Sequence, residues 1–363
     1  MQQTSADISI EELDALKNLV NDYFHSTAQP IFSFLSGSIP EGISTPNSDY
    51  DIYAVFDDCT EEEVLISELQ RPVELTKIPL SKIHRIMDII SKGENLASVS
   101  AYEMLICHRV YSGIALSGEP AFDSIKKEFD VVTFRTRLAE LALLNAEREL
   151  KVSHGFKLVD DTRSALFSAH KALRHSLSVL LAIHGSTSVL EKWHVRYAVR
   201  YLGENHLGFR RFLELASSIP ISSTVESKKY LNSVKKFHQM VTDYKILADI
   251  VPEEIFFVES RLIDTDQEND EPLILKNPDA RVMLHVSRWY LTIESKAILE
   301  LPSSAALFWA LINNAQSVNV IIDSAREHLK IPDNICLEYL DALAAAKAIS
   351  SRSFEIHKIH RAI

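Results

Sequence analysis

The chain has 363 residues, a length that favours two or three domains over a single core. Hydrophobic residues make up 46% of it and charged residues 24%, and no apolar run approaches the roughly 18 residues of a membrane span, so we expect a soluble protein with no membrane partner. The formal net charge of −12 argues against nucleic acid as the main partner, because non-specific affinity for its backbone comes from clustered cations.

The N-terminal segment predicts a helix, since apolar residues recur at helical spacing from Ile10 to Phe24. Five acids in the first thirty residues do not fit a signal or transit peptide, so we expect a cytoplasmic protein. Cys59, Cys107 and Cys336 lie far apart in the sequence, which argues against a disulfide framework and a zinc site.

Three short runs rich in aromatic and β-branched residues predict strands: IFSFL, DIYAVF and RPVELTKIPL. We expect a short helix after the Gly37-Ser38 turn and a further helix over about Glu61 to Leu69. The fold class predicted for residues 1–130 is therefore α/β, a small mixed sheet with helices.

The pattern after Ser81 is almost wholly helical, which predicts an all-α domain over residues 131–263. The acidic run DTDQENDEP, residues 264–272, has the composition of a solvated linker. Residues 273–363 show two strand-like runs, RVMLHVSRWYLTI and KAILELP, followed by three helical segments, and this order predicts a winged-helix-like domain. The helical segments expected after Ser81 are 81–92, 100–116, 133–152, 161–184, 189–201, 208–217 and 225–249.

Asp49 and Asp51 form the main candidate site. They lie one residue apart on a predicted strand, where side chains alternate, so both carboxylates should project from one face. Two adjacent carboxylates repel unless a cation lies between them, and Mg²⁺ prefers such hard oxygen ligands. The pair therefore predicts a magnesium site.

Gly37 and Ser38 lie where the first strand ends, and a close backbone approach, free N–H groups and a hydroxyl suit phosphate oxygens. We place Ser48, directly before Asp49, with these nucleotide-binding residues. Glu74 is the acid of the next strand run, and its position suits either a third metal ligand or a general base that deprotonates an acceptor hydroxyl.

This pattern resembles the nucleotidyltransferase superfamily of DNA polymerase beta type: Gly37-Ser38 is followed, after ten residues, by Asp49-Tyr50-Asp51. Within that superfamily, the chain is most similar to the aminoglycoside adenylyltransferases that modify streptomycin and spectinomycin, through the segments SGSIPEGISTPNSDYDIYAVF and RPVELTKI. This resemblance implies triphosphate contact for Gly37 and Ser38, Mg²⁺ ligation by the two aspartates and a catalytic base role for Glu74. It also implies ATP as the favoured donor and a small hydroxylated acceptor.

The resemblance covers about residues 30 to 130, and one departure concerns the acceptor: Glu41-Gly42 stands where the family usually has two glycines. Two C-terminal segments faintly resemble RiPP recognition elements, which bind leader peptides: LELPSSAALFWALINNAQSVNVIIDSAREHL and EYLDALAAAKAI. A peptide or protein acceptor, through RiPP-type tailoring or protein AMPylation, is therefore an alternative. A non-catalytic regulator that senses a nucleoside triphosphate is another.

Two further candidates lie in the predicted helical domain. His170 and Arg174 are four residues apart, so one helix face could present both to a triphosphate. Trp193 could line an acceptor pocket, although tryptophans more often pack in cores and domain interfaces.

Overall fold

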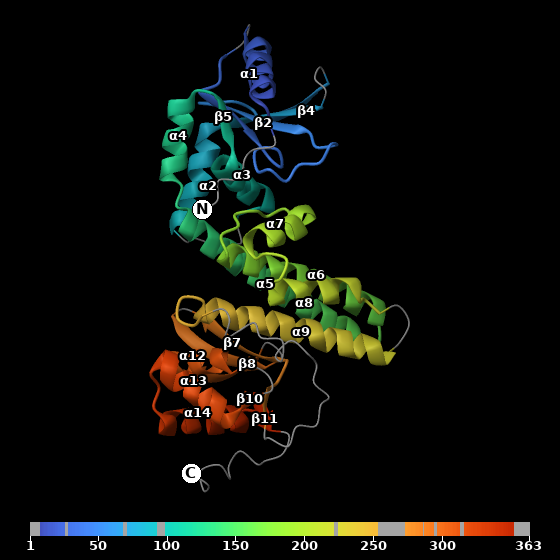
Figure 1. Ribbon diagram of the computed structural model, residues 1–363, viewed down its shortest axis with the longest axis vertical. Coiled ribbons are helices and arrows are strands. Elements are labelled where there is room, and N and C mark those ends of the chain that lie inside the picture. Colours follow the sequence, from blue (N-terminus) through green and yellow to red (C-terminus); the bar gives the residue numbers. More distant parts are fainter. Residues whose placement is uncertain are drawn as a thin grey trace. The chain divides into compact units, whose positions relative to one another are not determined.

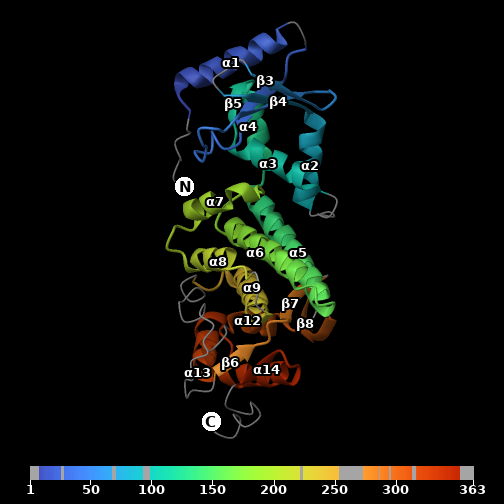
Figure 2. The same ribbon diagram turned by 90° about the vertical axis from the view of Figure 1, so that its right-hand side faces the viewer.

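The computed structural model divides into two compact units, and Figures 1 and 2 label helices and strands of both. Unit 1 comprises Met1–Leu141 and Gly185–Arg196, and unit 2 comprises Ala142–His184 and Tyr197–Ile363. The structure describes residues 8–25, 28–67, 71–92, 99–220, 224–252, 273–285, 287–293, 296–312 and 316–351. The predicted linker, residues 264–272, lies outside these ranges.

Unit 1 begins with the predicted helix, which is confirmed as α1 (Ile10–Phe24). Ser9 caps it: the Ser9 hydroxyl accepts a hydrogen bond from the Glu12 backbone N–H, and the Glu12 carboxylate accepts one from the Ser9 N–H. The apolar face of the helix buries Leu16, Val20 and Phe24 in the core of the unit. Helical periodicity made this segment predictable, and the capping box fixes where the helix begins.

The sheet of unit 1 has five strands in the order β3-β4-β2-β1-β5. β2 and β4 are parallel, and the other neighbours are antiparallel, so the predicted small mixed sheet is confirmed. The strands are β1 (Phe32–Ser36), β2 (Tyr50–Phe56), β3 (Glu62–Ile66), β4 (Val73–Pro79) and β5 (Ile114–Ser117). β2, at the centre, buries most of its residues, which explains its continuous apolar run.

Two predicted helices of unit 1 are wrong. The segment expected to be helical over Glu61 to Leu69 contains β3, which pairs antiparallel with β4. Val64 and Ile66, two residues apart, both face the core, and this spacing is the period of a strand. The short helix after Gly37-Ser38 is a turn, closed by a 2.9 Å hydrogen bond from the Ile43 N–H to the Ser38 carbonyl. Gly42 takes the left-handed conformation (φ 63°), which a right-handed helix does not allow.

The predicted helix over 100–116 ends earlier, at Gly113, where the chain becomes extended and continues as β5. A Cβ atom on Gly113 would lie 2.7 Å from the Phe34 ring, so a glycine allows helix and sheet to approach closely. The remaining helical elements of this unit are α2 (Leu80–Lys92), α3 (Ala101–Ser112), α4 (Glu119–Glu128), the first part of α5 (Val131–Leu158) and the 3-10 turn η2 (Glu191–Trp193).

Unit 2 is mainly helical in its first part, as predicted. α6 packs against α8 and α9, and α9 packs against α12 of the C-terminal segment. The helices here are the second part of α5, α6 (Thr162–Ile183), α7 (His194–Tyr201), whose first turn belongs to unit 1, α8 (Leu207–Ser217) and α9 (Thr224–Leu247). Within the part of the chain that the structure describes, no helix combines the length and the apolar character that a membrane crossing requires.

The C-terminal part contains the three expected helices, α12 (Ser303–Leu311), α13 (Val318–Ser324) and α14 (Asp333–Ala345). The run RVMLHVSRWYLTI forms two strands instead of one, because the chain reverses at Ser287 (φ 63°). The strands form two sheets, β7-β8-β9 and β10-β6-β11. The winged-helix assignment stays a prediction. The strand bounds are β6 (Leu273–Lys276), β7 (Ala280–His285), β8 (Arg288–Ile293), β9 (Lys296–Leu301), β10 (Gln316–Ser317) and β11 (Ile349–Ser351).

A neutral histidine lies in the helical core of unit 2. The Ser176 hydroxyl donates to the Ala172 carbonyl (2.8 Å), so the fully buried His238 must donate its Nδ1 proton to the Ser176 oxygen (2.9 Å). His238 Nε2 has no hydrogen-bond partner among the described residues. Burial, with help from the charge of Arg281, lowers the pKa of His238 well below its ordinary value of 6.5.

Candidate functional site

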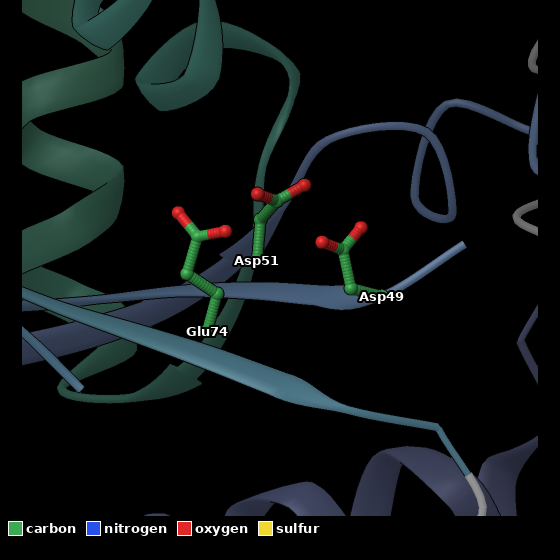
Figure 3. A group of neighbouring side chains, drawn as sticks. All are labelled: Asp49, Asp51 and Glu74. Atoms are coloured by element: carbon green, nitrogen blue, oxygen red, sulfur yellow. The ribbon is translucent and has the colours of Figure 1, made fainter. Parts of the chain in front are cut away.

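Three carboxylates meet at one end of the sheet of unit 1. One oxygen from each of Asp49, Asp51 and Glu74 lies within 4.8 Å of the others, and all three side chains project from the same side of the sheet (Figure 3). Asp51 of β2 is in parallel register with Glu74 of β4, which places the two carboxylates side by side. Asp49 directly precedes β2 and does not lie within it, but its carboxylate joins the group as the sequence predicted.

The three acids repel one another in a partly buried setting. Burial raises the pKa of Asp51, and the negative charge of Asp49 raises it further, while the charge of Arg109 acts in the opposite direction. Burial also raises the pKa of Glu74, with the charge of Asp51 as the next cause. A bound cation would relieve this repulsion, so the group has the charge and the oxygen donors of a divalent metal site.

Arg109 of α3 contacts this site and was not among the residues predicted from the sequence. Its Nη2 donates to Asp51 Oδ1 at 3.0 Å, and its Nη1 donates to the Tyr53 hydroxyl. Asp51 and Arg109 are separated by 58 residues, so no spacing rule connects them. A single arginine in the apolar stretch EMLICHRVY was the available signal, because a buried arginine needs a carboxylate partner.

Gly37 is required by the position of Asp51. Its backbone is left-handed (φ 83°), and a Cβ atom there would lie 2.1 Å from Asp51 Oδ2. The glycine therefore makes room for the carboxylate oxygen that Arg109 does not bind. The predicted contact of Gly37 with a triphosphate stays a prediction.

Ser38 and Ser48 are buried at the two ends of the Gly-Ser loop, by which we mean residues 37–48. The Ser38 hydroxyl donates to Ser48 Oγ (3.1 Å), and Ser48 Oγ also accepts from the Thr45 backbone N–H (2.9 Å). Both hydroxyls thus cross-link the loop that leads from β1 to Asp49. Their predicted role in nucleotide binding is not tested by these contacts.

Two arginines hold the same loop from outside. Arg71 Nη1 donates to the Thr45 carbonyl at 3.4 Å, and Arg196 Nη1 donates to the carbonyls of Ile43 (2.5 Å) and Ser44 (2.9 Å). Arg71 is the arginine of the RPVELTKI run, three residues before Glu74. The loop is therefore fixed by charge-assisted hydrogen bonds to its backbone.

Glu41, within the Gly-Ser loop, has a buried side chain. Its Oε1 lies 3.1 Å from His108 Nε2, and His108 Nδ1 lies 2.9 Å from Thr187 Oγ1. This chain of contacts joins the Gly-Ser loop, α3 and the segment 185–196. His108 is therefore a structural partner of Glu41.

The segment 185–196 brings basic residues to the carboxylates. The charge of Lys192 is among the causes that lower the pKa of Asp51 against the effect of burial. Lys192 and Arg196 both lie over the ring of Trp193, at 5.6 and 5.3 Å from its centroid. An anion near the carboxylates would therefore also meet positive charge.

The other predicted phosphate candidates lie on α6 in unit 2. His170 Nδ1 is 3.4 Å from the Tyr230 hydroxyl, and the neighbouring Lys171 pairs with Glu149 at 3.9 Å. Contact of His170 or Arg174 with a triphosphate stays a prediction.

No family model matches the chain, and no curated protein matches it. Among solved structures, the chain is similar to a nucleotidyltransferase-like protein from Exiguobacterium sibiricum 255-15, with 14% sequence identity and a TM-score of 0.40. The match covers 72% of this chain and 81% of that chain.

Proposed function

We propose that the chain is a magnesium-dependent nucleotidyltransferase. It transfers a nucleoside monophosphate, AMP from ATP by resemblance, to a hydroxyl group of a small acceptor and releases pyrophosphate. The observation that carries the proposal is the group of Asp49, Asp51 and Glu74, with ligand oxygens within 4.8 Å of one another. The Gly37-Ser38 turn beside this group supports it, because the same elements carry the superfamily resemblance.

The residues present fit a magnesium ion. Asp49 and Asp51 would bind it, since both offer hard carboxylate oxygens and Gly37 leaves space beside Asp51 Oδ2. Bound magnesium would neutralise charge on the triphosphate and orient it for in-line displacement. Arg109 restrains the other oxygen of Asp51, so this carboxylate is oriented in advance.

Glu74 is the proposed general base. Burial raises its pKa, and a carboxylate with a raised pKa is a stronger proton acceptor. It would take the proton from the acceptor hydroxyl while the hydroxyl oxygen forms a bond to the α-phosphorus. The bond from that phosphorus to pyrophosphate breaks in the same displacement.

The Gly-Ser loop would contact the triphosphate through Gly37, Ser38 and Ser48. Its neighbours Lys192 and Arg196 add positive charge on the side of the segment 185–196. Their location suits an anionic donor substrate, because a polyphosphate needs charge compensation beyond the metal ion.

The test is release of pyrophosphate by purified protein incubated with Mg²⁺, ATP and a panel of hydroxylated small molecules. We expect Asp51→Asn and Asp49→Asn to lose metal binding and turnover. Asp57→Asn, an exposed acid directly after β2, is the matched control and should keep both. If the two aspartate variants bind Mn²⁺ as the unmodified protein does, the proposed site is wrong.

Glu74→Gln separates the two roles of Glu74. If Glu74 is the general base, Glu74→Gln should keep its affinity for nucleotide and metal and lose turnover. Loss of nucleotide and metal binding would make Glu74 a third metal ligand. Nucleotide binding by the unmodified protein without turnover of any acceptor would instead favour the nucleotide-sensing regulator.

A peptide or protein acceptor is the second candidate, and one observation favours it. β9 is an edge strand of the β7-β8-β9 sheet, and its Ile298 and Leu299 are 49% and 37% exposed. An extended peptide can add to such an edge through main-chain hydrogen bonds. Incubating a cell extract with the protein and labelled ATP decides between the candidates. Label on a peptide supports the peptide acceptor if Ile298→Asp abolishes the labelling. The control Val225→Asp, on α9, should leave the labelling unchanged.

A further inference from the structure

A pocket remote in sequence from the carboxylate group lies wholly within unit 2. α5, α9 and the β7-β8-β9 sheet form its walls, and these elements can be followed in Figures 1 and 2. It encloses about 560 Å³, its open mouth included. Its charged lining comprises Glu147, Lys151, Lys235, Asp279 and Arg281, and His154 lies beside them.

The pairing of β7 with β8 turns Arg281 toward this pocket. Arg281 and Met283 alternate on β7 and share one face, and Thr292 of β8 lies opposite Arg281 on that face. Val282 and Leu291 occupy the other face, where they are buried and α12 packs against both strands. One face of the hairpin thus belongs to the core and the other lines the pocket.

Most charges near the pocket are already compensated. Lys235 forms an ion pair with Asp279, and the buried Lys276 forms one with Asp243 (2.6 Å). Arg281 differs, because its Nη1 is buried and has no hydrogen-bond partner among the residues that the structure describes. A buried guanidinium N–H without a partner costs more free energy than most side-chain groups, so its retention calls for an explanation.

Glu147 is the acid whose charge acts most strongly on Arg281, ahead of Asp279 and Asp243. Its charge attracts Arg281, but no ion pair joins the two side chains within the described residues. Burial raises the pKa of Glu147, and the charge of Arg281 acts in the opposite direction. Lys151 adds a second cation at the exposed rim.

We propose that this pocket binds a small anion through a carboxylate or phosphate group, with Arg281 as the main donor and Lys151 at the rim. The planar guanidinium offers parallel N–H donors that match both groups. Leu150 and Met283 line the same pocket and would contact an apolar part of the ligand. The site is independent of the proposed nucleotidyl transfer, since none of its residues belongs to the carboxylate group.

The proposal predicts an unusual effect of Arg281→Met. This change removes a buried charge with an unpartnered donor and keeps most of the side-chain volume. We therefore expect the variant to be at least as stable as the unmodified protein in chloride buffer. It should also lose the stabilisation that an anion confers.

The experiment uses inorganic phosphate and acetate as separate probes, with sodium chloride at matched ionic strength as the reference. Calorimetry measures Kd, and hydrogen exchange locates the protected segments. We expect protection of residues 147–154 and 279–285, and the stronger probe identifies the anionic group. Arg281→Met should weaken Kd by about tenfold or more, because hydrogen bonds to charged groups contribute at that level.

Two further variants keep the test decisive if Arg281→Met does not fold. Arg281→Lys keeps the charge but loses the paired donors, and Lys151→Ala removes the rim cation; both should weaken binding. Lys157→Ala, an exposed lysine on the same helix and outside the pocket, is the control and should bind normally. Absence of protection by either probe, protection confined to the Gly-Ser loop, or an unchanged Kd in the pocket variants would overturn the proposal.

Discussion

Replacing Gly37 by alanine perturbs the carboxylate group through one added methyl group. A Cβ atom at this position would lie 2.1 Å from Asp51 Oδ2, and the neighbour is a side chain held by Arg109. Either Asp51 moves and its contact with Arg109 is lost, or the Gly-Ser loop shifts. Both outcomes change the ligand set of the proposed metal site.

The expected loss of stability has two parts. A left-handed backbone costs an alanine about 1–2 kcal/mol relative to glycine. Disturbing the hydrogen bond between Asp51 and Arg109, two largely buried charged groups, adds about 1–3 kcal/mol. We therefore expect Gly37→Ala to lower the free energy of unfolding by about 2–5 kcal/mol.

Gly203→Ala is the matched control. Gly203 has nearly the same φ, 86° against 83°, but nothing lies within 4 Å of an added Cβ atom. Gly203→Ala should lower the free energy of unfolding only by the cost of the left-handed backbone, about 1–2 kcal/mol. Urea unfolding gives both free energies, and titration with Mn²⁺ gives metal affinity, which only Gly37→Ala should weaken. Equal stability losses in both variants together with unchanged metal binding would refute the reasoning.

Other predictions concern buried polar contacts. Arg109→Met should raise the pKa of Asp51 further by removing its opposing charge, so metal binding, followed by calorimetry, should begin at higher pH; an unchanged pH profile would contradict this. His108→Ala removes a hydrogen-bond partner of Glu41 and should cost about 1–3 kcal/mol in urea unfolding, whereas a neutral effect would mean that the contact does not stabilise the loop. The pKa of His238 is lowered in the folded state, so the unfolded state binds the extra proton and the free energy of unfolding falls as pH drops below 6.5. His238→Gln should flatten that part of the curve of unfolding free energy against pH. An identical slope in the variant would show that His238 is not the group responsible.

The fold was predictable where local signals agreed with one another. Helical periodicity located α1, and aromatic and β-branched runs located β1, β2 and β4. The prediction was wrong for β3, because a short acidic segment with a few apolar residues fits a helix or a strand. Only its pairing with β4 decides between them.

The sequence by itself determined which carboxylates could meet, because the spacing of Asp49 and Asp51 and the strand around Glu74 are local features. Only the tertiary structure decided what surrounds them. Arg109 reaches Asp51 across 58 residues, and His108 reaches Glu41 across 67, through the packing of α3 on the sheet. Likewise, the buried Arg281 donor follows from strand pairing and helix packing in unit 2. Such partners depend on long-range packing, and no local period or spacing encodes it.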